Sequence, residues 1–223
     1  MHGHRHPPWS ARALLARALL ARAPLARALL AISLLAIALP AQRAPSAAAR
    51  RLAERNAARY DDMFRRYGKR YFGVGYDWRY FKAQGMAESG LDPAARSWVG
   101  ARGVMQLMPS TFRFIQTRRP EFRSIDDPEW NIAAGIMHDR YLWTLWSSSV
   151  SEAERPAFMF GSYNAGAGTI ERARRAAELP ANDTLRWSHI EQVAPTVPRW
   201  RYRETLDYVR KIERYYAALR RPR

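Results

Sequence analysis

The end of a helix is visible in residues 76–93, "YDWRYFKAQGMAESGLDP". We predict a helix that runs to Ser89 and stops at Gly90, because glycine readily takes the left-handed conformation that follows many helices. An Asp-Pro turn comes next, in which Asp92 ordinarily caps its own backbone. The pattern therefore places Glu88 in the last turn of the helix.

The position of Glu88 is unfavourable for a charged carboxylate. Unpaired carbonyls and the negative end of the helix dipole raise the pKa of an acid there. Asp92 is the only other carboxylate between Trp78 and Pro120. A glutamate that stays protonated in an apolar cleft is what a general acid acting on a glycosidic oxygen requires. An ordinary surface glutamate is the alternative for this residue.

The rest of the body is helical in pattern. Asp127 and Pro128 begin a helix, and residues 129–146, "EWNIAAGIMHDRYLWTLW", are apolar nearly all round, which indicates a buried central helix. The last helix aligns Leu206, Val209 and Ile212 on one stripe. No alternating strand pattern of useful length is present. The sequence predicts one all-α domain over residues 58–223.

Composition limits the chemistry and suggests a partner. The chain has 223 residues, a formal net charge of +17 and no cysteine, which excludes disulfides and thiol nucleophiles. The first 44 residues hold six arginines and no acid, so residues 45–223 carry a formal net charge of +11. Such a body is attracted to polyanions, among them an anionic cell wall, nucleic acid or anionic lipid. A merely well-solvated surface would explain the charge equally well.

The N-terminus is typical of a targeting segment. Residues 28–39 form a charge-free apolar run that follows basic residues and contains an A-x-A site at 36–38. The run is shorter than the roughly 20 residues that span a bilayer. We predict a signal peptide over 1–41 and an Ala/Pro-rich linker over 42–57. An uncleaved anchor with membrane association through this segment is the alternative.

Four blocks of the sequence resemble the soluble lytic transglycosylase family. They are "ESGLDPAARSWVGARGVMQLMPSTF" (88–112), "NIAAGIMHDRYL" (131–142), "SYNAGAG" (162–168) and "ETLDYVRKI" (204–212), and they occur in the family's order. The stretch 71–84 is most similar to the membrane-bound type F branch. The resemblance implies an all-α, lysozyme-like (goose-type) fold and a periplasmic or cell-envelope protein.

The same resemblance implies a substrate and a mechanism. The substrate would be peptidoglycan glycan strands, cleaved after N-acetylmuramic acid with formation of a 1,6-anhydro ring. Glu88 would protonate the leaving oxygen and then, as a carboxylate, accept the proton of the sugar's 6-hydroxyl. No obvious second carboxylate lies near Glu88 in sequence, which agrees with a mechanism that needs none. Proteins of the cell-wall machinery are further candidate partners.

The resemblance implies seven substrate-binding residues, each at a position that matches one of the family's motifs: Ser97, Gly103, Met105, Gln106, Tyr163, Asn164 and Tyr208. Met105 and Tyr208 could instead be core residues, and Asn164 only a helix-end residue. Glu191 is a candidate supporting acid, although the segment from Pro195 to Arg203 departs from the family's shorter one. Trp187 and Trp200 are candidates for stacking on sugar, against the usual core role of tryptophan.

Other function classes remain open on the sequence alone. A non-catalytic glycan-binding or scaffold protein would share the fold, and a lysozyme-type hydrolase would differ only in its product. A nucleic-acid binder would explain the charge but would need none of the four blocks. We expect no nucleic-acid partner and no cofactor. No metal site is expected either, because His138 and His189 lack a metal-binding spacing.

Overall fold

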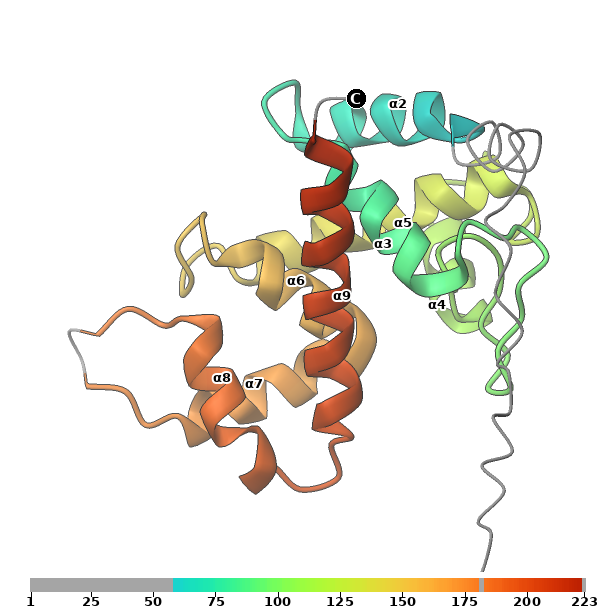
Figure 1. Ribbon diagram of the computed structural model, residues 1–223. Coiled ribbons are helices and arrows are strands. Elements are labelled where there is room, and N and C mark those ends of the chain that lie inside the picture. Colours follow the sequence, from blue (N-terminus) through green and yellow to red (C-terminus); the bar gives the residue numbers. More distant parts are fainter. Residues whose placement is uncertain (1–57, 181–182, 222–223) are drawn as a thin grey trace, which may run out of the picture. The chain divides into compact units, whose positions relative to one another are not determined.

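A computed structural model describes residues 58–180 and 183–221 of the chain (Figure 1). The predicted signal peptide (1–41) and linker (42–57) lie outside these residues and stay predictions. The described part is helical, with isolated β-bridges and no strand, which confirms the all-α class. Its elements are α2 (Asp61–Phe72), α3 (Arg79–Ser89), α4 (Pro109–Gln116), α5 (Pro128–Leu145), α6 (Arg155–Ala165), α7 (Ala167–Ala176), α8 (Trp187–Val193), the 3₁₀ turn η1 (Ala194–Thr196) and α9 (Tyr202–Arg220).

Helix α3 ends where the sequence predicts. Gly90 takes the left-handed conformation (φ 66°, ψ 23°), and its N–H donates to the Met86 carbonyl. The helix begins at Arg79, later than the pattern suggests, because Asp77 accepts the Arg79 backbone N–H in a turn. Ser89 donates to the Val104 carbonyl at 2.8 Å and so joins the end of α3 to the following loop.

Helix α5 forms the centre of the domain. Its cap is the one expected, since the Asp127 carboxylate accepts the backbone N–H groups of Glu129 and Trp130. Most of its first two turns are buried, as the apolar pattern predicts. Gly135 permits close packing on this helix, because a Cβ at that position would lie 2.8 Å from the Met105 side chain. The helix thus supports the loop that precedes α4.

Helix α9 passes along α3 and α6 (Figure 1). Leu206, Val209 and Ile212 are buried on the predicted stripe. Near the other end of the helix, the Tyr216 ring stacks on Tyr80 of α3 with centroids 3.6 Å apart. These contacts fix the register of α9 against α3, and with it the position of Tyr208.

The two candidate sugar-stacking tryptophans belong to the core. Trp187 and Trp200 are at most 9% exposed. Trp187 packs so closely on Gly161 of α6 that a Cβ there would lie 2.2 Å from its ring. The stacking hypothesis is therefore wrong for both residues, because their ring faces are covered by protein. Among the described residues, no helix combines the length and apolar character needed to cross a membrane.

Candidate active site

The centre of the site is a contact between α3 and α9. The Tyr208 hydroxyl donates to Oε1 of Glu88 at 2.5 Å, although 120 residues separate the two in sequence. Lys211, one turn further along α9, donates through Nζ to the Ala87 carbonyl at 2.8 Å. A cation thus lies at the carbonyl end of α3, where the helix dipole favours it. The sequence did not single out Lys211.

The pKa of Glu88 is raised from its ordinary value of 4.5 to about 7. Burial is the main cause, while the hydrogen bond from Tyr208 and the charge of Lys211 oppose it. The predicted direction is therefore right, but the reason differs from the helix-dipole explanation. Near neutral pH the carboxyl group can both give and accept a proton, which suits acid–base chemistry.

The loop between α3 and α4 is held by its own polar groups. Gly103 has φ 76°, and a Cβ there would lie 2.5 Å from the Asn131 amide, so only glycine fits. Gln106 donates through Nε2 to the carbonyls of Ala95 and Gly103. The Ser97 hydroxyl accepts the Ala101 backbone N–H at 2.9 Å. The hydrogen bonds of Ser97 and Gln106 shape the loop, and neither is made to Glu88.

Met105 and Tyr163 connect the loop to α6. The Tyr163 hydroxyl donates to the Met105 carbonyl at 2.8 Å, and burial together with the nearby Glu88 charge raises the pKa of Tyr163 well above its usual range. Met105 itself is fully buried. Its side chain therefore belongs to the core, which was the alternative for this residue, and only its backbone faces Tyr163.

Asn164 and Glu191 lie outside this group of contacts. Asn164 accepts a hydrogen bond from the Thr205 hydroxyl at 2.8 Å, which joins the end of α6 to the start of α9. Glu191 forms a 2.9 Å ion pair with Arg210, a partly exposed contact between α8 and α9. Tyr208 and Lys211, not Glu191, are the polar groups that act on Glu88. The assignment of Glu191 as a supporting acid is not favoured by this geometry.

Asp139 of α5 is a buried acid that the sequence analysis missed. It has no exposed surface and accepts a hydrogen bond from Gln84 at 3.2 Å. Burial raises the pKa of Asp139 well above its usual range, the Gln84 hydrogen bond lowers it, and the charge of Glu88 raises it further. Oδ2 of Asp139 and Oε1 of Gln84 are buried without a partner among the described residues. An aspartate in a helix dominated by apolar residues was the signal that could have revealed it.

We expect Asp139→Asn to stabilise the protein at neutral pH. An acid whose folded pKa is raised binds more protons when folded, so its stability contribution falls as pH rises above its unfolded pKa. Asparagine does not ionise, so the variant does not lose stability as the pH rises. Its amide can also donate a hydrogen bond to Oε1 of Gln84. The expected gain in unfolding free energy at pH 7 is on the order of 1 kcal/mol, the usual size of a single-residue effect.

Urea unfolding at pH 7 and pH 3.5 measures this effect. Most of the gain of Asp139→Asn should be lost at pH 3.5, where the aspartic acid is protonated in the folded state and largely protonated in the unfolded state. Asp207→Asn is the control, because that side chain is 77% exposed. Equal destabilisation of Asp139→Asn at both pH values would contradict a neutral, buried Asp139.

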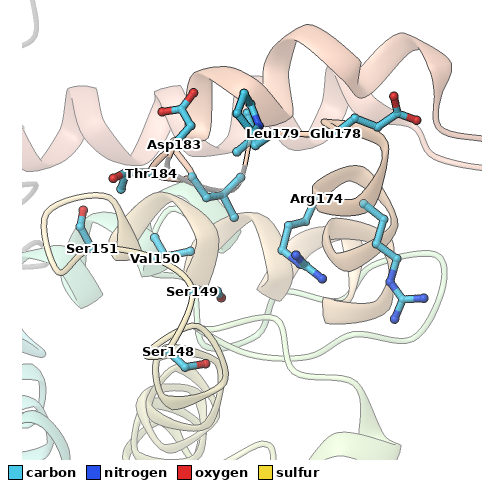
Figure 2. Close-up of a pocket in the computed structure, with 12 residues that line it drawn as sticks. Ser148, Ser149, Val150, Ser151, Arg174, Glu178, Leu179, Asp183 and Thr184 are labelled. Atoms are coloured by element: carbon cyan, nitrogen blue, oxygen red, sulfur yellow. The ribbon is translucent and has the colours of Figure 1, made fainter.

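A large cavity of the described residues has neither Glu88 nor Tyr208 in its lining. Figure 2 shows this cavity, about 700 Å³ in volume, between the turn after α5, where Ser148 to Ser151 lie, and the segment that follows α7. Within residues 58–180 and 183–221, no group of three or more His, Cys, Asp or Glu side chains is arranged to hold a metal ion.

Comparisons with known proteins show the family of the chain. Residues 63–185, more than half of the chain, match the family model of the Transglycosylase SLT domain. The membrane-bound lytic murein transglycosylase F of Marinobacter nauticus is 32% identical over 177 residues, which cover 74% of this chain and 34% of that protein. The chain thus spans about a third of the length of the curated relatives that it matches.

Two solved structures of lytic transglycosylases are similar to this chain. The 70 kDa soluble lytic transglycosylase of Escherichia coli is 26% identical with a TM-score of 0.53, over 76% of this chain and 26% of that chain. A complex of the 70 kDa soluble lytic transglycosylase with bulgecin A is 28% identical with a TM-score of 0.57, over 76% and 25% of the two chains. Fold and site define a lysozyme-like helical domain centred on one glutamate. The chain belongs to the transglycosylase SLT family.

Proposed function

We propose that the chain is a lytic transglycosylase that cleaves peptidoglycan glycan strands. The bond broken is the β-1,4 link between N-acetylmuramic acid and N-acetylglucosamine. The observation that supports this proposal is the Glu88–Tyr208 contact, in which a carboxyl group with a pKa of about 7 is held by a neutral donor. The proposed substrate is inferred from the family of the chain and from the names of its relatives.

The proposed reaction uses Glu88 twice. The protonated carboxyl group first gives its proton to the leaving glycosidic oxygen, and the C1–O bond breaks. The 6-hydroxyl of the same muramic acid then bonds to C1, and the Glu88 carboxylate accepts its proton. The products are a 1,6-anhydro-muramyl end and a free 4-hydroxyl, and Glu88 is protonated again. No water is consumed.

The structure supports a mechanism with one catalytic acid. A hydrolase needs a second carboxylate that reaches the sugar or an activating position for water. Asp139 is the buried acid whose pKa responds to the Glu88 charge, but it has no exposed surface and cannot contact a substrate. The charge of Glu88 also raises the pKa of Asp139, because two nearby buried carboxylates do not both ionise readily.

We further propose that the protein acts outside the cytoplasm, in the cell envelope. The apolar run and A-x-A site of the first 41 residues support export. The related membrane-bound murein transglycosylase points to the same location. The positive body suits an anionic wall, because long-range attraction raises the rate of encounter.

Product analysis tests the proposal. Purified peptidoglycan is treated with the protein, and the soluble fragments are measured by mass spectrometry. We expect anhydro-muropeptides, which are lighter than the hydrolysis products by one water. Reducing ends in their place would make the protein a hydrolase. Absence of soluble products, with retained binding to peptidoglycan, would favour the non-catalytic glycan-binding alternative.

A further inference from the structure

The side chain of Lys211 joins α9 to the carboxyl end of α3. Its Nζ donates to the Ala87 carbonyl at 2.8 Å, although 124 residues separate the two positions in sequence. The side chain is half-buried, and Nζ lies 5.9 Å from the centre of the Tyr215 ring, one turn further along α9. Contacts with two helices thus hold the ammonium group in place.

The ammonium group of Lys211 lies where a carboxylate is otherwise disfavoured. Ala87 precedes Glu88 in the last turn of α3, where the final carbonyls lack helical partners and the dipole end is negative. Lys211 satisfies one of these carbonyls and adds a positive charge that lowers the pKa of Glu88. One contact therefore secures the backbone of α3 and offsets the negative end of the helix.

The polar groups that act on Glu88 come from three helices. On α9, the Tyr208 hydroxyl donates to the carboxylate and Lys211 supplies its charge. Tyr163 on α6 and Asp139 on α5 lie close enough for the Glu88 charge to raise the pKa of each. Of these four groups, Lys211 alone is positively charged, so it alone attracts the carboxylate as an ion.

We propose that Lys211 is a positioning residue of the reaction, which holds the end of α3 and stabilises the Glu88 carboxylate that forms when the proton is given away. Lys211 acts through Glu88 and needs no contact with the sugar. This inference rests on the proposed function and deepens it. The carboxylate is the product of the first step and the reactant of the second, so a fixed positive charge favours both uses of the same acid.

Three substitutions separate the charge of Lys211 from its hydrogen bond. Lys211→Gln keeps a donor for the Ala87 carbonyl without the charge, Lys211→Met removes both, and Lys211→Arg keeps both. We expect the pKa of Glu88 to rise by about 1 in the Gln and Met variants, the lower end of the usual effect of a nearby opposite charge. In Lys211→Arg the pKa of Glu88 should stay near the wild-type value of about 7.

Two measurements on the full chain test these expectations. Carbon NMR titration of the Glu88 carboxyl group gives its pKa in the free protein, independently of turnover. The pH dependence of kcat/KM for purified glycan strands should show an alkaline limb about one pH unit higher in Lys211→Gln. Because a weaker acid gives up its proton less readily, kcat should fall about three- to tenfold, whereas KM should stay within about twofold.

Arg210→Gln is the matched control, because it removes one positive charge from the neighbouring position of α9. The Arg210 guanidinium forms its 2.9 Å ion pair with Glu191 of α8. The Glu88 titration and the pH profile of this variant should match those of the wild type. Circular dichroism should show that all variants are folded.

An unchanged pKa of Glu88 in both Lys211→Gln and Lys211→Met would overturn the proposal, even if activity fell, because Lys211 would then only brace α3. An equal shift in Arg210→Gln would also overturn it, since the effect would then follow the net charge of the protein. If the wild type releases no anhydro-product, the proposed function fails, while the titration still decides whether Lys211 controls the ionisation of Glu88.

Discussion

Glu88→Gln should abolish glycan cleavage and leave the fold and strand binding intact. Glutamine preserves the size of the side chain and can still accept the Tyr208 hydrogen bond, but it cannot exchange a proton. Because Glu88 serves as both acid and base in the proposed mechanism, we expect turnover to fall by about a thousandfold or more. Anhydro-muropeptide release, measured by mass spectrometry against the wild type, gives the size of the loss.

The same variant has a second, opposite effect on stability. The folded pKa of Glu88 is about 7, against an ordinary value of 4.5, so the wild type loses stability as pH rises through this window. Glu88→Gln does not share that loss. Above pH 7 it should be more stable than the wild type by up to about 3 kcal/mol, and the difference should vanish only well below pH 4.5.

Glu152→Gln is the matched control, because Glu152 is exposed in the loop before α6. It should retain wild-type turnover. Substantial anhydro-product formation by Glu88→Gln would refute the single-glutamate mechanism. An inactive variant that is also unfolded or unable to bind strands would show that Glu88 has a structural role.

Tyr208→Phe should lower activity and shift its pH dependence. The hydroxyl donates to Glu88 at 2.5 Å and stabilises the carboxylate, so its removal raises the pKa of Glu88 further. A hydrogen bond to a charged group contributes about 1.5–3 kcal/mol, which corresponds to a loss of about 10–100-fold in kcat/KM. The alkaline limb of the pH–rate profile, which reports loss of the acid form, should move to higher pH.

Tyr216→Phe provides a strict comparison for this variant. It makes the same change on the same helix, but the Tyr216 hydroxyl donates to Asp77 and not to Glu88. Its pH–rate profile should match that of the wild type. A Tyr208→Phe enzyme with lower activity but an unshifted alkaline limb would indicate that Tyr208 only packs, and that another group controls protonation of Glu88.

Local rules of helix formation made much of the fold predictable. Gly90 ends α3 and Asp127 begins α5 as the sequence indicates, because capping depends on residues that are adjacent in the chain. The stripe of Leu206, Val209 and Ile212 likewise predicted the buried face of α9. Glu88 could be proposed as the candidate acid because its helix-end position and the surrounding blocks are features of sequence.

Only the tertiary structure decided what surrounds Glu88. Tyr208 and Lys211 act on Glu88 from α9, a helix distant in the chain, and the local sequence around Lys211 does not indicate this role. The same limit explains why Trp187 and Trp200 were open to a sugar-binding role, since burial depends on packing between helices.

The sequence by itself thus indicated the main helices and several of their ends, because these depend on short-range steric and hydrogen-bonding preferences, and it made Glu88 the candidate acid through its helix-end position and the surrounding blocks. The tertiary structure decided the pKa of that acid, since desolvation and long-range hydrogen bonds arise only when α3, α5 and α9 pack together.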